Sequence, residues 1–185
     1  MAALAQELGL PASLVPWHSA RDGFARLGAE LAIVAGVAGK IGRDVSLLMQ
    51  PEVGEAAEAA KAGRGGSSSM PHKRNPALSM LALEAAQRAP ALAATLLSQL
   101  TPEHERGLGQ WQSQWFTLRE LVCAAASGAA AMADALEDLE VSETKMRANL
   151  AVLLKDQPQD FGAAGAMIER ALAEWKAATS PGTAP

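Results

Sequence analysis

The chain has 185 residues, enough for one domain of ordinary size, and 49% of them are hydrophobic, so a buried core is feasible. Aromatic residues make up only 4%, with no tyrosine, so the core must consist mainly of small and aliphatic side chains, which favours closely packed helices. The net charge of −4 argues for neither nucleic acid nor a membrane surface as a partner.

The first half of the sequence predicts one short and one long helix. Residues 1–8 read as the end of a helix, stopped by Gly9 and Pro11. A second helix is predicted to end near Gln50, because Pro51 cannot continue it. Its apolar residues recur at steps of three and four: Phe24, Leu27, Leu31, Val34, Ala38, Ile41, Val45 and Leu48. Four glycines inside it predict close approach of neighbouring backbones: Gly28, Gly36, Gly39 and Gly42.

The second half predicts further helices after a loop over residues 51–75. One helix starts at Pro76 or Ala77 and reaches about Leu100, with a kink or a split at Pro90. The next has an apolar stripe of about seven turns: Trp111, Trp115, Leu118, Val122, Ala125, Ala129, Met132 and Leu136. Ser142 is a predicted N-cap of a short helix, and a last helix covers about residues 162–177.

No stretch alternates with period two for long enough to predict a strand, so the fold class is all-α. Helices of this length, with glycines on one face, are typical of a long-helix bundle, which several subunits can share. We expect a central helical-bundle domain over residues 1–138, a shortened helical region over 139–178 and a disordered tail over 179–185.

Cysteine usage and the N-terminus indicate a cytoplasmic protein. Cys123 is the only cysteine, which excludes an internal disulfide. The first residues lack the basic and apolar regions of a signal peptide. The most apolar window, residues 31–39, is far shorter than the roughly 20 residues that a membrane helix needs. Three widely separated histidines and one cysteine predict no metal site.

Residues 63–76, "GRGGSSSMPHKRNP", interrupt the helical pattern with an anion-binding composition. Gly65 and Gly66 let the backbone approach a ligand, and Lys73 and Arg74 bring positive charge. The helix that follows points its positive end at the loop, so a carboxylate or phosphate ligand is expected. The alternative is a flexible, solvated loop.

The ordered string "GSSSMPHKRNP" resembles the signature of the fumarase/aspartase superfamily, G-S-S-x-M-P-x-K-x-N. Its specified positions all match: Gly66, Ser67, Ser68, Met70, Pro71, Lys73 and Asn75. The ending "HKRNP" is similar to two branches, the adenylosuccinate lyases and the 3-carboxy-cis,cis-muconate cycloisomerases. The flanks "PWHSARD", "AGKIGRDVSLLMQPEVGE", "ERGLGQWQSQW" and "LEVSETKMRANL" resemble the cycloisomerases.

The resemblance implies an enzyme acting on a small carboxylate, in which Ser67 removes or returns a proton. A serine hydroxyl needs its alkoxide stabilised to act so, which loop N–H groups and Lys73 can do. Ser68, Met70, Lys73 and Asn75 are implied substrate contacts. The cycloisomerase branch closes a muconate into a lactone in protocatechuate breakdown, and the resemblance implies no metal or organic cofactor.

The resemblance also places Trp17, His18 and Arg21 at the active site. The alternative is that His18 caps the next helix and Arg21 pairs with Asp22 on the surface. His104 is expected to be a loop residue near the site. Trp111 and Trp115 are expected in the core or in a subunit contact.

The chain departs from the superfamily pattern outside the loop. Ala20 and Gly23 stand where the family usually has Gln and Arg, and two upstream motifs are not found. We expect a truncated central and partial C-terminal portion of a cycloisomerase-like protein, incomplete as an isolated chain. The superfamily forms homotetramers whose active sites take segments from three subunits. The alternatives are an adenylosuccinate-lyase-like enzyme and a non-enzymatic helical oligomer; neither nucleic acid nor a membrane is an expected partner.

Overall fold

The computed structural model describes residues 2–61, 63–155 and 160–179 and has the predicted helices. The chain divides into two compact units, Met1–Glu143 and Thr144–Pro185. The first unit contains α1 (Ala2–Leu8), α2 (Asp22–Leu48), α3 (Ala77–Leu97), a 3-10 turn (Ser98–Leu100) and α4 (Gln110–Glu137). The second unit is formed by α5 (Glu143–Leu154), whose first residue still belongs to the first unit, and α6 (Ala164–Thr179). Of the predicted tail, Thr179 is instead the last residue of α6, and residues 180–185 lie outside the described residues.

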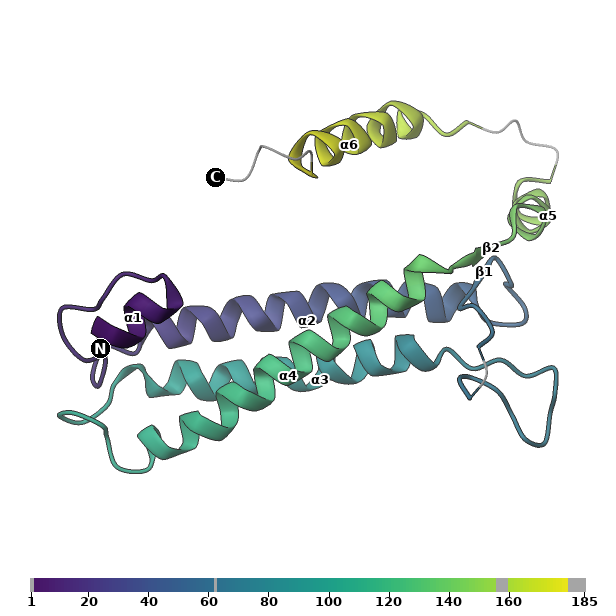
Figure 1. Ribbon diagram of the computed structural model, residues 1–185. Helices are drawn as coiled ribbons and strands as arrows, with labels where there is room; N and C mark the ends of the chain where they lie inside the picture. Colours follow the sequence, from purple (N-terminus) through teal and green to yellow (C-terminus); the bar gives the residue numbers. More distant parts are fainter. Residues whose placement is uncertain (1, 62, 156–159, 180–185) are drawn as a thin grey trace. The chain divides into compact units, whose positions relative to one another are not determined.

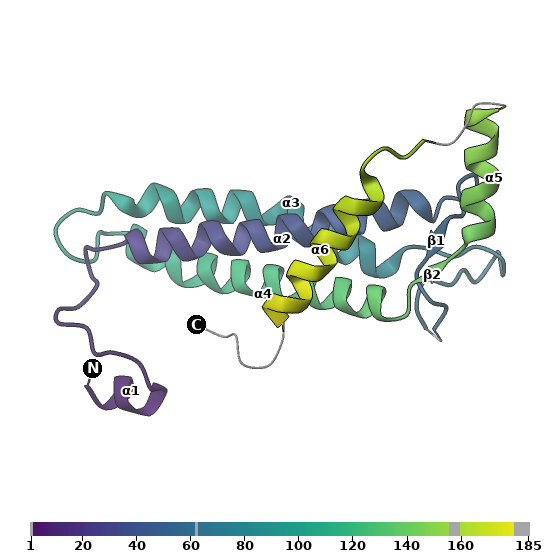
Figure 2. The same ribbon diagram turned by 90° about the horizontal axis from the view of Figure 1, so that it is seen from above.

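Three long helices, α2, α3 and α4, run side by side and form the bundle (Figures 1 and 2). The predicted all-α class is confirmed, with one addition. Ala56–Ala57 (β1) pairs antiparallel with Glu140–Val141 (β2), with Ala56 opposite Val141. Two residues per strand are too few to show alternation in a sequence, so this ladder escaped prediction.

Small side chains form the contact between the three helices. One core cluster combines alanines with two leucines: Ala35, Ala89, Ala93, Leu96, Leu121 and Ala125. A second cluster lies nearer the end of the bundle where α3 begins and α4 ends: Ala38, Leu78, Ala82, Ala131, Met132 and Ala135. A Cβ added to Gly39 would overlap the Cβ of Ala86, so the predicted close approach is confirmed there. Gly36 is the exception, because nothing lies within 4 Å of such a Cβ.

The predicted stripe on α4 is partly wrong. Met132 and Ala125 are buried, but Trp115, Val122 and Leu136 are 58%, 43% and 45% exposed. The buried face is rotated toward residues small enough for close helix packing: Leu121, Ala124, Ala125, Gly128, Ala131, Met132 and Ala135. The larger apolar side chains are therefore left on the outside of the bundle.

Two further expectations need correction. The α3 helix continues through Pro90, so a split is wrong. Pro90 lies on the exposed side, where water can bind the carbonyl that lost its N–H partner. The expectation that no stretch is long enough to cross a membrane considered only residues 31–39. Within the described ranges α4 alone is long and apolar enough to cross a membrane, by length and composition only. Buried core helices meet the same criterion, and α4 packs on α2 and α3.

We expect Gly39→Ala to lower the free energy of unfolding by about 1–3 kcal/mol, because the new methyl group overpacks the contact with α3. Gly36→Ala is the matched control on the same helix. Its new methyl group meets open space, so it should instead stabilise by up to about 1 kcal/mol through helix propensity. Urea unfolding followed by circular dichroism measures both, and equal effects would contradict the packing account.

Candidate functional site

The signature loop is closed at its base by contacts between Gly65 and Asn75. Asn75 donates to the Gly65 carbonyl from its backbone N–H at 2.7 Å and from its side-chain amide at 3.2 Å. Gly65 has φ +69°, and a Cβ there would lie 2.6 Å from the Asn75 carbonyl oxygen. Only glycine fits this combination of a left-handed backbone and a close approach. The nine residues between Gly65 and Asn75 therefore form a loop whose two ends are held together.

The serines lie within this loop. Ser67 is half-buried, and its hydroxyl accepts a hydrogen bond from the Met70 N–H at 3.2 Å and lies 3.5 Å from the Ser69 hydroxyl. A hydroxyl oxygen that accepts from a backbone N–H is better able to carry negative charge. Ser68 and Met70 are exposed.

A cavity of about 340 Å³ lies at the base of the loop. Lys73 and Asn75, two predicted substrate contacts, line it, but Ser67, Ser68 and Met70 do not. Three further cationic side chains, from Lys61, Arg64 and Arg74, also line it. The predicted anion-binding character is therefore concentrated at the base rather than around the serines.

Glu58, which the sequence analysis missed, occupies the N-terminus of α3. Its carboxylate accepts from the Leu78 N–H at 3.0 Å, the Ser79 N–H at 2.7 Å and the Ser79 hydroxyl at 2.8 Å. Both Glu58 and Ser79 are buried. The expectation that this helix end attracts a ligand anion is wrong, because a carboxylate of the chain itself binds its free N–H groups.

No local pattern marks Glu58 as a cap. It stands 20 residues before Leu78, whereas sequence searches for caps consider the few residues before a helix. The residue at the usual position, Pro76, makes no side-chain cap.

Two ion pairs tie the loop region to the segment after α4. Lys61 binds Asp138 at 2.6 Å, and Arg74 binds Glu140 at 2.9 Å. Arg74 also donates to the Glu58 carbonyl. The hydrogen bond and charge of Lys61 lower the pKa of Asp138, and Arg74 does the same to the pKa of Glu140. These contacts fix the loop beside the β1–β2 ladder.

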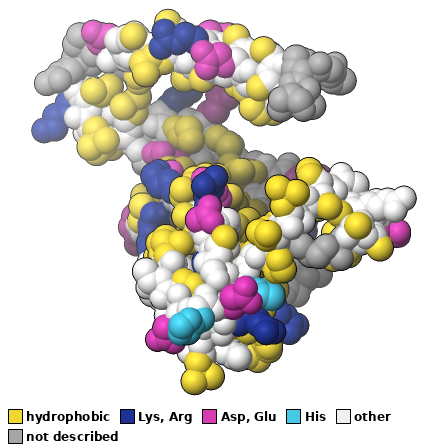
Figure 3. All heavy atoms as spheres, turned by 90° about the vertical axis from the view of Figure 1, so that its left-hand side faces the viewer, with side chains coloured by type: hydrophobic (Ala, Val, Ile, Leu, Met, Phe, Trp, Pro, Cys, Tyr) yellow, Lys and Arg dark blue, Asp and Glu magenta, His cyan; other side chains and the backbone are white. Residues whose placement is uncertain are grey.

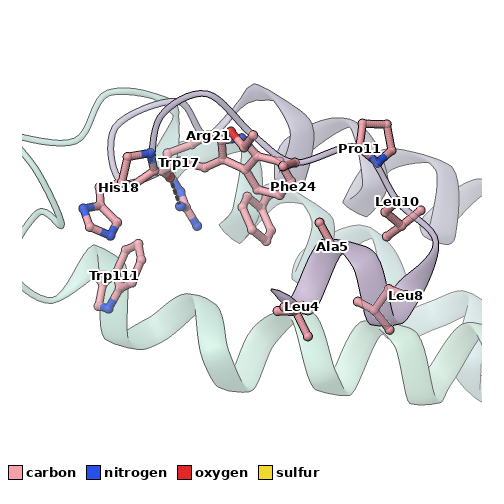
Figure 4. A pocket seen from close by; sticks show the side chains of 13 residues that line it. Leu4, Ala5, Leu8, Leu10, Pro11, Trp17, His18, Arg21, Phe24 and Trp111 are labelled. Atoms are coloured by element: carbon pink, nitrogen blue, oxygen red, sulfur yellow. Dashed lines mark hydrogen bonds between the residues drawn. The ribbon is translucent and has the colours of Figure 1, made fainter. Parts of the chain in front are cut away.

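The second predicted group, Trp17, His18 and Arg21, comes together before α2 (Figure 4). Arg21 is buried and donates a hydrogen bond to the Trp17 carbonyl at 2.6 Å. Its Cζ lies over two rings, 4.2 Å from the ring centroid of Phe24 and 5.1 Å from that of Trp111. Burial lowers the pKa of its guanidinium. The predicted alternative of a surface pair with Asp22 is wrong.

The His18 ring lies edge to face with Trp111, with the ring centroids 5.4 Å apart. The His18 Nδ1 lies 3.5 Å from the Glu105 carboxylate. It does not cap α2, whose first position has no side-chain cap. The Ser19 hydroxyl donates to the His104 carbonyl at 2.7 Å, so His104 belongs to the loop packed on this segment, at the end of the bundle viewed in Figure 3. An adjoining cavity of about 380 Å³ is largely apolar.

Within one chain the two groups are not brought together. Trp17, His18 and Arg21 precede the first turn of α2, and the loop follows its last turn (Figure 1). Its 27 residues separate them by about 40 Å. Neither the cavity of about 340 Å³ nor that of about 380 Å³ contains members of both groups. No group of three or more potential metal ligands occurs in the residues that the structure describes.

We expect Glu58→Ala to lower the free energy of unfolding by about 2 kcal/mol or more, because two buried N–H groups and a hydroxyl lose their acceptor. Glu52→Ala, an exposed change in the same segment, is the control and should stay within about 0.5 kcal/mol. Urea unfolding measures both. A Glu58 variant as stable as the control would show that the cap is dispensable.

The Lys61–Asp138 pair should give a measurable pH effect. Because the pKa of Asp138 is lowered in the folded chain, the pair stabilises above the ordinary carboxyl pKa, about 4, and this is lost as pH falls through the lowered value. We expect Lys61→Met to raise the pKa of Asp138, measured by NMR titration of its carboxyl carbon. The exposed Glu52 serves as the internal reference, and an unchanged Asp138 titration would contradict the pairing.

Known proteins resemble this chain over most of its length. A family model described as "Lyase" matches residues 2–90. A 3-carboxy-cis,cis-muconate cycloisomerase of Pseudomonas aeruginosa is 53% identical over 149 residues, which cover 80% of this chain and 32% of that protein. A nitrosuccinate lyase of Streptomyces davaonensis is 45% identical over 80% of this chain and 31% of its own length.

A solved structure gives the same result for the fold. The 3-carboxy-cis,cis-muconate lactonizing enzyme of Pseudomonas putida matches with a TM-score of 0.73 and 38% identity, over 94% of this chain and 36% of that one. The chain spans about a third of the length of the curated relatives it matches. With its signature loop, its bundle and these relatives, the chain belongs to the fumarase/aspartase superfamily of lyases.

Proposed function

We propose that this chain is part of a cycloisomerase that closes 3-carboxy-cis,cis-muconate into a lactone. The observation that carries the proposal is the complete signature loop in a chain 53% identical to a cycloisomerase of that name. In the reaction one substrate carboxylate adds to the diene, and a neighbouring carbon gains a proton. Carboxylate binding and one well-placed proton donor are therefore what the site must supply.

Each requirement has a candidate residue in the loop. Ser67 transfers the proton, because its oxygen is held by the Met70 N–H and can carry charge as the proton leaves. Lys73 and Asn75 bind a substrate carboxylate at the cavity. Ser68 and Met70 contact the substrate from the exposed side of the loop. We propose no metal or organic cofactor.

Trp17, His18 and Arg21 would reach the same substrate only from another copy of the chain. The length of α2, about 40 Å, keeps them from the loop of their own chain. Large apolar side chains exposed along the bundle, including Ile33, Val37 and Trp115, suit contacts between copies. We propose a homotetramer in which one chain contributes the loop and another contributes the Trp17 segment.

Complementation tests this proposal in a form that a partial chain allows. The full-length Pseudomonas aeruginosa relative, with its own loop serine replaced by alanine, is co-expressed with this chain under a second affinity tag. We expect doubly purified mixed oligomers to remove the diene absorbance of 3-carboxy-cis,cis-muconate, because Ser67 restores the missing group. The same oligomers with Ser67→Ala should show at least about a 100-fold lower rate, typical of losing a proton-transfer group.

The outcomes are distinct. Mixed oligomers that stay inactive, or that are equally active with Ser67→Ala, contradict the role of Ser67.

The second candidate function is elimination from a succinate derivative, favoured by the 45% identity to a nitrosuccinate lyase. Release of nitrite from nitrosuccinate, without loss of the muconate diene, would favour it instead. Binding of an adenylosuccinate nucleotide would revive the adenylosuccinate-lyase alternative.

A further inference from the structure

A small polar cavity lies beside Arg21, between the 3-10 turn after α3 and the first residues of α4. Its volume is about 10 Å³, and its lining includes His18, Arg21, Gln99, Gln110 and Gln114. Arg21, Gln99 and Gln114 are buried. One enclosed water needs roughly 10–15 Å³, so the cavity is of the size of a single water and too small for a larger ligand.

Two of these glutamines have a buried oxygen that lacks a partner. Gln99 Oε1 and Gln110 Oε1 accept no hydrogen bond in the described part of the chain. The neighbouring Ser113 fixes which way the Gln99 amide points. The Ser113 hydroxyl donates its one proton to the Gln110 carbonyl at 3.0 Å, so it must accept from Gln99 Nε2, at 2.7 Å. The amide cannot turn over to bring its oxygen to Ser113, and this oxygen therefore needs a donor elsewhere.

The burial of the two oxygens also indicates a small ligand. Both atoms have almost no accessible surface. An acceptor that faces an open cavity shows a broad accessible area, whereas an acceptor that touches one enclosed water shows nearly none. The donor that these oxygens lack is therefore a molecule of the size of a water, held on several sides.

The charge of Arg21 selects water over an ion. A guanidinium has five N–H groups, and among the described residues Arg21 donates to one acceptor, the Trp17 carbonyl. The positive charge of Arg21 disfavours a cation between the two glutamine oxygens, and the oxygens disfavour an anion. A water can donate one proton to each oxygen and accept a hydrogen bond from the guanidinium, so it matches all three groups.

We propose that one water molecule binds in this cavity, donates to Gln99 Oε1 and Gln110 Oε1, and accepts a hydrogen bond from Arg21. The water thereby links Arg21 to the 3-10 turn and to the start of α4. This link adds to the hydrogen bond with the Trp17 carbonyl on the other side. The water site does not depend on the proposed reaction.

A high-resolution crystal structure of the chain tests the site directly. We expect one ordered water within about 3.2 Å of Gln99 Oε1, of Gln110 Oε1 and of a guanidinium nitrogen of Arg21. Crystals of Gln110→Met should lack this water, because it loses one of its acceptors. A direct amide hydrogen bond between Gln99 and Gln110 with no water between them, or an ion bound in place of the water, overturns the proposal.

Thermal unfolding distinguishes a bound water from an unpaired oxygen by the sign of the effect. Gln110→Met keeps a similar helix propensity and side-chain length. With the water bound, the variant should melt about 2–4 °C lower, because the water loses a hydrogen bond. Removing an oxygen that is merely unpaired should leave the melting temperature unchanged or raise it.

Gln50→Met is the matched control, because Gln50 is exposed, and its melting temperature should stay that of the unmodified chain. A Gln110→Met chain that melts at or above the temperature of this control overturns the proposal. A lower melting temperature together with loss of the water from the crystal structure upholds it.

Discussion

The capping of α3 by Glu58 is the contact on which the arrangement of the loop depends. A helix N-terminus after a glycine- and serine-rich loop is an obvious place for an anion to bind. In this chain a buried carboxylate takes the Leu78 and Ser79 N–H groups, so α3 is stabilised without any ligand. In the proposed site, a substrate carboxylate is therefore bound by side chains of the loop and its base. This moves the expected binding chemistry from the helix dipole to Lys73, Asn75 and their cationic neighbours.

The bundle explains why the loop alone does not form a complete site. Alanine and glycine faces let α2, α3 and α4 pack closely, and this gives a long, straight scaffold with the loop after one end of α2. The same choice of small residues leaves larger apolar ones, such as Ile33 and Phe116, on the outside. A scaffold of this length separates Arg21 from Lys73. In the proposed homotetramer, the exposed apolar side chains are the surface on which further copies pack and complete the site.

Much of this could be predicted from the sequence, for identifiable reasons. Periodicity and the breakers Gly9 and Pro51 predicted the ends of α1 and α2 within a few residues, because helix termination is a local property. The buried face of α4 was predicted less well, since Trp115 and Ala124 both fit a helical stripe and only packing decides which one faces the neighbours. Glu58 could not be predicted at all, because a cap that comes from 20 residues away leaves no local pattern.

The cations of the loop show the same limit and suggest how it can be overcome. In the sequence Lys61, Arg64, Lys73 and Arg74 are equivalent as sources of positive charge. In the structure Lys61 and Arg74 hold the loop to Asp138 and Glu140, and these pairs lower the pKa of both carboxyl groups. The charge of Arg64 also lowers the pKa of Asp138, which leaves Lys73, the cation that the signature predicts, without an ion-pair partner among the residues that the structure describes. Residues whose charge is already paired within the chain, such as Lys61 and Arg74, are poor candidates for ligand binding.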